Sequence, residues 1–444
     1  MADDDGFLSP IDCLMPWTYI RQIFCFQSTD PLIPRQLREG LRLTLLDIPY
    51  LARGIVKDHR GVASLSGSAQ TLDDLFRSRD LTTGLDYSAL KAKHFPPSAL
   101  TVPDVVPQET NAPFPDPAPV FRAVLSRVKG GYLLCVAVQH CTTDITGFGS
   151  LLRIWASHCQ EQPPIAEVKF SWLDRRALSG SVEPPSSIPE LLHLREGSTR
   201  HRPRLDPATF DMVIFKFSSD SLRKLKVGAS EHLTFRDVEW LSTSDVLIAL
   251  LWSAVIYAET DVETTTQAVS SETSTIGLPV NFRSQLEPPL PKEYLGAAFG
   301  MTSATTLRKD LTSCAASGSL ATLASIATAI RKAISRVGND SIRRSIAFLQ
   351  AWEDTNTVQL GPPHDGISIV SWATEGVYDL NWGERAGRID SVRVQKWPGK
   401  RYPIILPRLP DGGLEVLMSL EEPIMRNLRE GLLMTSYSSV VCVS

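Results

Sequence analysis

A histidine at the end of an apolar run is the residue of this sequence best suited to chemistry. His140 follows the uninterrupted apolar stretch Tyr132–Val138. Such a stretch predicts a strand buried on both faces, and a histidine at its end is held by rigid backbone where the sheet stops. An imidazole that titrates near neutrality can accept a proton from a hydroxyl as that oxygen attacks a carbonyl carbon, which accelerates such reactions roughly 10²–10⁴-fold. We therefore take His140 as a candidate general base.

Two residues shortly after His140 extend this candidate site. Asp144 either orients the imidazole or braces the turn through a cation elsewhere in the chain, and Gly147 lets the backbone approach a ligand or lets the turn close. A spacing of H-x-x-x-D arises often by chance. Taken alone, it favours a structural interpretation, in which a histidine whose ring nitrogens are hydrogen-bonded within the protein ends a strand. The aspartate then caps the helix that follows.

Other catalytic arrangements fit this segment less well. Cys141 is adjacent to His140, so on an extended chain the two side chains diverge, which disfavours a cysteine–histidine nucleophilic pair. The sequence contains no G-x-S-x-G elbow for a hydrolase serine, no glycine-rich phosphate loop and no HExxH helix. A metal at His140 and Asp144 would need further ligands that no pattern singles out, so no metal site is predicted.

Apolar spacing predicts the elements that position His140. Tyr19 to Phe26 alternates like a strand, and a helix is predicted over Pro34 to Ile48. A further helix after Gly147 is expected to present one apolar side, made of Phe148, Leu151, Leu152 and Trp155. Residues 95–120 are rich in proline and are predicted to be irregular.

The second half of the chain repeats this mixture of strands and helices. Strands are predicted at Phe210–Phe217 and at Leu414–Met418, and an apolar helix through Tyr257 starts at the capping sequence Ser242–Asp245. A regular amphipathic helix is followed by Gly338, and its apolar face consists of Leu320, Leu323, Ile326, Ile330 and Ile334. The pattern predicts a mixed α/β protein.

A stretch rich in proline, serine and arginine at 176–208 is the best linker candidate. Because 444 residues exceed what one core usually holds, two domains are expected. We assign residues 1–185 to an N-terminal domain, 186–208 to a crossover linker and 209–444 to a C-terminal domain.

Composition limits the classes of partner and the compartment. A net charge of -4 with both signs spread along the chain disfavours nucleic-acid binding. The acidic start has no signal-peptide features, and the apolar stretch Val246–Ala258 is too short to span a bilayer, so it is predicted to be a buried helix. The 7 cysteines are scattered without a CxxC pair, which is typical of a reducing compartment. We expect a cytoplasmic protein that binds no membrane.

Several ordered segments resemble the BAHD acyltransferase superfamily, particularly its fungal branch that includes the trichothecene acetyltransferases. The resemblance runs nearly from end to end. His140 to Asp144 falls on the family's HXXXD motif, with Gly147 where a small residue is common. The other matching segments are Ser9-Pro10-Ile11-Asp12, the residues through Leu45, Pro49 and Leu51, the stretch Val280–Pro291, Ser371-Trp372, Gly413–Val416 and Leu420–Glu422. Such an ordered series is far more specific than HXXXD alone.

This resemblance implies a fold and a set of roles. It implies two similar chloramphenicol-acetyltransferase-like α/β domains with mixed sheets around a central solvent channel, and an acyl-CoA, most simply acetyl-CoA, as co-substrate. His140 is then the general base that activates the hydroxyl of a small metabolite. Asp144 turns away from the channel and pairs with Arg283, and Ser371 and Trp372 lie near the thioester. The family needs no bound cofactor and is usually monomeric.

The family's DFGWG motif is expected just after Trp372, and the sequence departs from it there. Spacing places the motif at Asn381-Trp382-Gly383-Glu384-Arg385, with Asn in place of Asp and the later Trp-Gly lost. A register two residues earlier, starting at Asp379, recovers Asp and Trp-Gly but breaks the spacing, so the first is preferred. The motif is structural in the family, so the change concerns local architecture or CoA-side geometry more than the base. Trp382 is equally well explained as an aromatic residue of the core.

Three other functions remain open at this level. A peptide-synthetase condensation domain shares the fold but usually carries HHxxxDG, where this chain has Gln139 and Ile145. Such an enzyme would take its acyl group from a carrier. A relative with a repurposed site could perform non-acyl chemistry, and an inactive relative could merely bind a metabolite. The acceptor and the acyl chain are not specified by the sequence.

Overall fold

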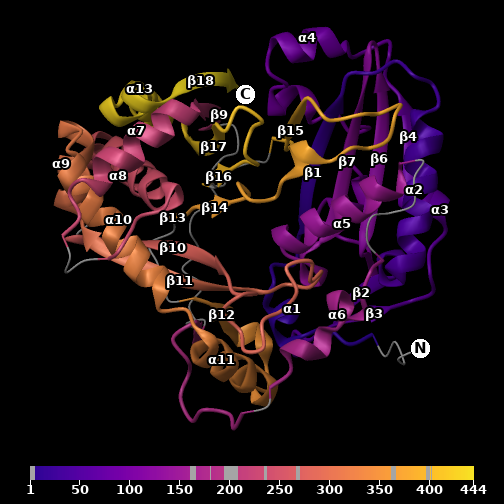
Figure 1. Cartoon of the computed structure of the whole chain (residues 1–444), viewed down its shortest axis with the longest axis horizontal. Helices are drawn as coiled ribbons and strands as arrows, with labels where there is room; N and C mark the ends of the chain where they lie inside the picture. The colour runs from indigo at the N-terminus through magenta and orange to yellow at the C-terminus, as the bar shows by residue number, and fades with distance from the viewer. Residues whose placement is uncertain are drawn as a thin grey trace.

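The computed structural model describes residues 6–160, 167–180, 182–194, 209–234, 238–266, 271–361, 367–396, 401 and 403–444, with the backbone alone at 261 and 263–266. Two five-stranded sheets organise the chain, and they lie on opposite sides of the molecule in Figure 1. We call the region around each sheet a lobe.

The first sheet carries the strand that leads to His140. In sheet order its strands are β15 (Ser391–Arg393), β1 (Tyr19–Phe26), β7 (Gly131–Gln139), β6 (Phe121–Val128) and β4 (Phe76–Asp80). Every residue of β7 is buried, as its apolar sequence predicts. Helices α2 (Ile33–Asp47) and α5 (Ile145–His158) pack on one face, and α4 (Tyr87–Ala92) packs on the other. Trp155 of α5 donates a hydrogen bond to the carbonyl of Leu37 in α2, which ties these two helices together.

The second sheet repeats the strand directions of the first. Its order is β14 (Val370–Ser371), β16 (Ile404–Ile405), β17 (Leu414–Glu421), β9 (Phe210–Phe217) and β18 (Ser439–Val443). In each sheet one end pair is parallel and the other three pairs are antiparallel. The third strand from the parallel end of each sheet is also followed by a helix. In the first sheet α5 follows β7, and in the second α12 (Glu422–Glu430) follows β17. The prediction of two similar α/β units with mixed sheets is confirmed at the level of the fold.

The remaining elements surround these two sheets. The second lobe also contains α7 (Ser219–Ser230), α8 (Thr243–Thr266), α9 (Arg308–Ser317), α10 (Leu320–Ser335) and α13 (Leu432–Tyr437). Small sheets are formed by β11 (Phe299–Leu307), β10 (Thr273–Asn281) and β13 (Ile367–Ser368), by β12 (Val358–Leu360) and β8 (Leu192–Leu194), and by β3 (Ala63–Ser66), β2 (Gly54–Lys57) and β5 (Ala118–Pro119). The other helices are α1 (Pro10–Leu14), α3 (Leu72–Leu75), α6 (Phe170–Leu173) and α11 (Asn339–Ala351).

Helix α8 is longer than the apolar stretch from which it was predicted. It begins at a Ser242–Asp245 capping box and runs for 24 residues, of which Thr243–Thr260 is long and apolar enough to cross a membrane by length and composition alone. The expectation of a helix too short to span is therefore wrong. Of this window, 78% is buried within the protein, as expected for the central helix of the second core.

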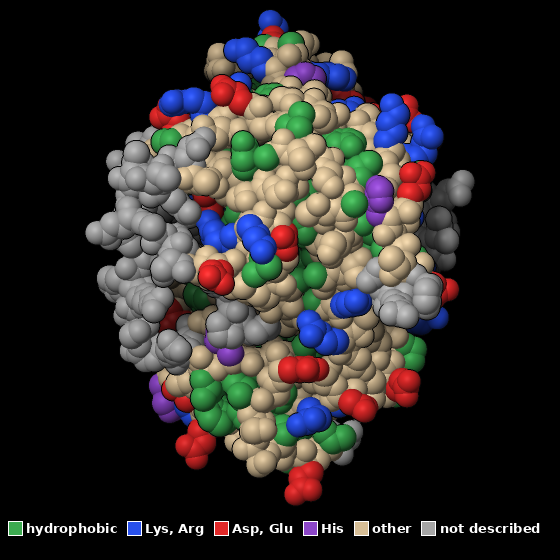
Figure 2. Space-filling model, turned by 90° about the vertical axis from the view of Figure 1, so that its left-hand side faces the viewer, with side chains coloured by type: hydrophobic (Ala, Val, Ile, Leu, Met, Phe, Trp, Pro, Cys, Tyr) green, Lys and Arg blue, Asp and Glu red, His purple; other side chains and the backbone are tan. Residues whose placement is uncertain are grey.

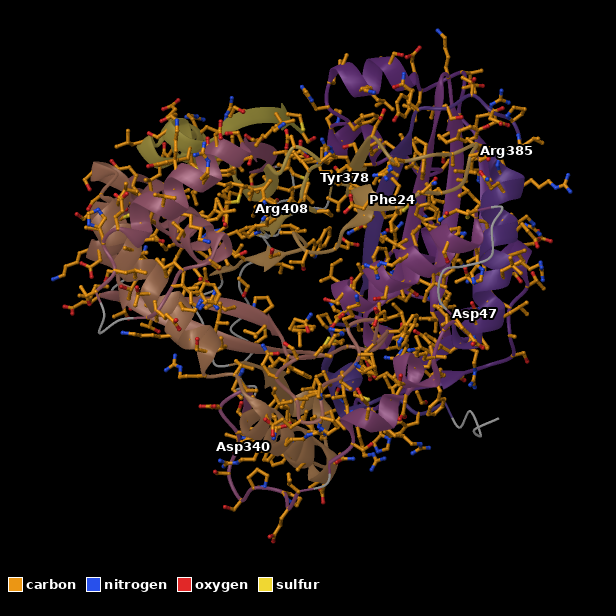
Figure 3. All side chains as sticks on the ribbon, viewed as in Figure 1. Phe24, Asp47, Asp340, Tyr378, Arg385 and Arg408 are labelled. Carbon is orange, nitrogen blue, oxygen red and sulfur yellow. The ribbon has the colours of Figure 1, made fainter. Side chains whose placement is uncertain are left out.

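A segment from the second half of the chain crosses back to the first lobe. After β14 the chain runs through residues 372–390 to β15, which pairs with β1 (Figure 1). Figure 3 shows Phe24 of β1 between Tyr378 and Arg385 of this crossing segment. Arg393 of β15 then forms a buried ion pair with Glu415 of β17 at 2.7 Å, so the two sheets are connected directly.

Two sequence-based predictions stay predictions. The proposed domain boundaries at 185 and 209 are not decided by the fold, and residues 195–208 of the predicted linker lie outside the described residues. The expected solvent channel also remains an expectation.

On the face of the second lobe seen in Figure 2, basic and acidic side chains are interspersed rather than gathered by sign.

Candidate active site

His140 lies at the end of β7, where the strand passes into a 3₁₀ turn, His140–Thr142. Its backbone amide donates to the carbonyl of Thr18 at 2.8 Å, which ties His140 to the residue that precedes β1. The imidazole Nδ1 lies 2.9 Å from the carbonyl oxygen of Thr143. A carbonyl can only accept, so Nδ1 carries the proton in the neutral ring and Nε2 keeps its lone pair.

The surroundings of the ring favour this neutral form. His140 is half-buried, and burial lowers the pKa of its imidazole below the ordinary value, because the charged form loses hydration. Among the described residues, Nε2 has no hydrogen-bond partner. The ring thus presents an unprotonated nitrogen at neutral pH, which is the state that a general base requires.

Asp144 braces the turn and does not contact the imidazole through any hydrogen bond among the described residues. It is the N-cap of α5, where its carboxylate accepts from the amide of Gly147 at 2.8 Å. Two parallel hydrogen bonds of 2.8 Å join it to the guanidinium of Arg283. Burial alone would raise the pKa of Asp144, but the charge and hydrogen bonds of Arg283 outweigh this effect and hold the pKa below its ordinary value.

Arg283 connects α5 to a loop of the second half of the chain. Its Nη2 donates to the carbonyls of Tyr294 and Gly296, in addition to Asp144. Gly147 permits this approach, because a Cβ atom there would lie 2.4 Å from the carbonyl oxygen of Leu295. The predicted Asp144–Arg283 pair is present, and the need for glycine at 147 is steric.

A second buried ion pair, which sequence reasoning missed, supports the same turn. Arg175 donates to Asp12 at 3.1 Å and to the carbonyl of Thr142 at 2.7 Å. Asp12 also completes a capping box with Ser9 at the start of α1. The spacing S-x-x-D is a signal for a helix start that would have singled out Asp12, but nothing local indicated that Arg175 would be its partner.

Trp372 lies close to the N-terminus of α5, and Ser371 precedes it at the end of β14. Trp372 is buried in a cluster with Met212 and Leu417, and Ile145, the first residue of α5, packs against this cluster. The Oγ of Ser371 accepts from the amide of Ala373 at 3.4 Å. No described contact joins either residue to His140. Instead the ring of Phe299, the first residue of β11, lies beside the imidazole at 6.2 Å between centroids.

The degenerate DFGWG region belongs to the core of the first lobe. Trp382 is fully buried against the rings of Trp155, Phe26 and Phe24. The Oδ1 of Asn381 accepts from the amide of Gly383 at 3.1 Å, the same local turn that an aspartate would make. Gly383 adopts a φ of +87°, with no room for a Cβ beside the carbonyl of Cys159. Trp382 and Gly383 are thus buried in the first lobe, whereas Asn381 is exposed.

Comparison with known proteins identifies the family. The chain belongs to the Transferase family, whose model matches residues 2–432. O-acetyltransferase astG of Aspergillus oryzae is 26% identical and aligns over 90% of this chain and 94% of its own length. Trichothecene 3-O-acetyltransferase TRI101 of Fusarium sporotrichioides is 25% identical, with 93% and 91% covered.

A solved structure with the same fold carries coenzyme A. F. graminearum TRI101 complexed with coenzyme A and deoxynivalenol superimposes with a TM-score of 0.83 at 19% identity, covering 98% of this chain and 99% of that one. The predicted family resemblance is thus confirmed. The chain is therefore a transferase of this family, and it shares its fold with an acetyltransferase-class relative that binds coenzyme A.

Proposed function

We propose that this transferase moves an acetyl group from acetyl-CoA to a hydroxyl of a small secondary metabolite, with His140 as general base. The observation that carries the proposal is the hydrogen bond from Nδ1 of His140 to the carbonyl of Thr143, since it leaves Nε2 free to take a proton. The O-acetyltransferase names of the relatives support an acetyl donor and an alcohol acceptor. We expect a cytoplasmic monomer whose substrates meet in a central solvent channel.

The chemistry then follows in two steps. The acceptor oxygen attacks the thioester carbon while its proton passes to Nε2 of His140, which gives a tetrahedral oxyanion and an imidazolium. Collapse of this intermediate breaks the carbon–sulfur bond, and the sulfur leaves as coenzyme A thiol with the proton from His140. The products are an ester and free coenzyme A, so all atoms and charges balance.

Asp144 has a supporting role in this mechanism. Both of its oxygens are occupied by Arg283 and by backbone amides, so it does not relay the proton. Its function is to hold the start of α5 and the turn that carries His140.

The test is release of coenzyme A thiol from acetyl-, malonyl- and benzoyl-CoA in the presence of a pooled fungal metabolite extract, with mass spectrometry of the products. We expect release that requires both donor and extract, and a product heavier by the acetyl mass. Transfer from an acyl group bound to a carrier protein, with free acyl-CoA inert, would contradict the proposal and favour a condensation-type enzyme. Tight metabolite binding without thiol release would favour a binding protein.

A further inference from the structure

Solvent reaches the region around His140 at a few positions only. In residues 131–150, all of which are described, His140, Ile145 and Thr146 are the only residues that are not buried. Across from them, Asn281 is exposed and Phe299 is half-buried, while their chain neighbours are buried. Apart from Ile145, which packs against the cluster of Trp372, these partly exposed positions are candidates for a common surface beside His140.

Contacts join four of these positions, His140, Phe299, Asn281 and Thr146, into a single cluster. The ring of Phe299 lies beside His140, and Phe299 is the direct cross-strand partner of Asn281 in the β10–β11 ladder. The side-chain amide of Asn281 donates to Oγ1 of Thr146 at 3.1 Å. Thr146 therefore faces the same surface as the base, although no sequence motif singled it out.

The hydrogen bonds in this cluster all point in one direction. The Oδ1 of Asn281 accepts from the backbone amide of Arg283 at 3.1 Å and from its Nη1 at 3.3 Å, which fixes the orientation of the amide. Its Nδ2 then donates to Thr146, whose own hydroxyl hydrogen has no acceptor among the described residues. A chain of donors that starts at a guanidinium polarises each member and strengthens the last donor.

From this geometry we infer that the hydroxyl of Thr146 is the donor that stabilises the tetrahedral oxyanion, with Asn281 as the residue that positions and polarises it. The inference rests on the proposed acyl transfer. As the thioester carbonyl is attacked, its oxygen gains a full negative charge. A preorganised hydrogen-bond donor stabilises this charged oxygen far more than it stabilises the neutral carbonyl. Thr146 donates a hydrogen bond only, so no proton is transferred at this position. Because Thr146 lies in the first turn of α5, the positive end of the helix dipole also stabilises the oxyanion.

Two substitutions at Thr146 separate the hydroxyl from the shape of the side chain. Thr146→Val removes the donor and keeps the volume, and Thr146→Ser keeps the donor. We expect Thr146→Val to lower kcat about 10²–10³-fold with little change in the KM for acetyl-CoA. Thr146→Ser should retain kcat within about threefold. The matched control is Thr275→Val, because Thr275 lies on the same face of β10 but pairs with Thr305 rather than with the site.

The measurements separate a failure of the role inferred for Thr146 from a failure of the proposed acyl transfer. Steady-state rates of thiol release are measured for these variants and for His140→Ala, with thermal unfolding to confirm that each variant is folded. A folded Thr146→Val enzyme that keeps a kcat close to wild type, while His140→Ala is inactive, would overturn the role of Thr146 and leave the acyl transfer intact. Loss of kcat in Thr146→Ser equal to that in Thr146→Val would also overturn it, because the hydroxyl would then not be the group that matters.

Discussion

Asp12 and Asp144 accept hydrogen bonds from two consecutive backbone amides, those of Ala297 and Ala298, at 2.9 and 2.8 Å. Each carboxylate is also paired with a buried arginine, Arg175 or Arg283. Two acidic residues from separate segments thus hold one short stretch of the second half of the chain. Because Arg175 also reaches the carbonyl of Thr142, the turn that carries His140 is held on both sides by residues distant in the sequence.

This arrangement predicts that Asp144 matters to stability more than to proton transfer. Removing one partner of a buried ion pair leaves an uncompensated charge, so Asp144→Ala should lower the free energy of unfolding by roughly 3–5 kcal/mol. Urea denaturation measures the change. As a control, Arg426→Ala breaks an exposed pair with Glu422 on α12 and should cost about 0.5 kcal/mol or less. Equal stability of wild type and Asp144→Ala would contradict the bracing role.

The local elements of the site could be predicted from the sequence, and the partners of its charged groups could not. The apolar run of β7 and the apolar side of α5 gave the position of His140, since strand and helix periods are local properties. Asp144 and Arg283 are 139 residues apart, and only the family resemblance joined them. Asp12 and Arg175 lie 163 residues apart, and no local pattern separates Arg175 from other arginines.

Two local features were also harder to assign than their patterns suggested. Gly338 follows the α10 pattern and was expected to mark the end of that helix, whereas it is the N-cap of α11. Glycine serves either end, because it adopts backbone conformations that other residues avoid. Trp382 could be a core residue or part of the site, and its packing against three aromatic rings places it in the core.

Glu375 on the crossing segment should make the stability of the fold depend on pH. Its side chain is 6% exposed and accepts one hydrogen bond, from Gln22 at 2.7 Å. Burial raises its pKa to about 8, although Gln22 and the more distant charge of Arg153 act in the opposite direction. The folded state therefore favours the protonated acid, and this stabilisation is complete below the ordinary pKa of 4.5 and is lost as the pH rises towards 8.

The comparison variant is Glu375→Gln, which keeps the shape but does not titrate. The unfolding free energy of the wild type should fall relative to this variant by up to about 1.4 kcal/mol per pH unit between pH 5 and 8. Denaturation curves at several pH values measure the difference. A constant difference over this range would mean that Glu375 is ionised in the folded protein.

Replacement of Asn381 by aspartate, which restores the family residue, should have little effect. The Oδ1 of Asn381 already accepts the hydrogen bond from the amide of Gly383, and the residue is exposed, so an added charge remains hydrated. We expect kcat within about twofold and an unfolding free energy within ~0.5 kcal/mol of wild type. A large gain of activity in Asn381→Asp would mean that this region acts on coenzyme A geometry.

The rate of acyl transfer should depend on pH through His140. The base is active when neutral, and burial lowers its pKa below the ordinary 6.5. As the pH falls, kcat/KM should therefore decline with a midpoint below 6.5 and should be constant from neutral pH upwards. A profile whose acidic limb has a midpoint well above 7 would contradict a neutral, buried imidazole as the base.

The most direct measurement is turnover of acetyl-CoA with an accepted alcohol by His140→Ala beside wild type and His158→Ala. His158 is a matched control, because it is also half-buried but lies at the C-terminal end of α5, where it contacts Asp47 of α2 (Figure 3 labels Asp47). We expect His140→Ala to lose nearly all turnover while it unfolds at the same denaturant concentration as wild type, and His158→Ala to stay active. Near-normal turnover in a folded His140→Ala enzyme would contradict His140 as the general base.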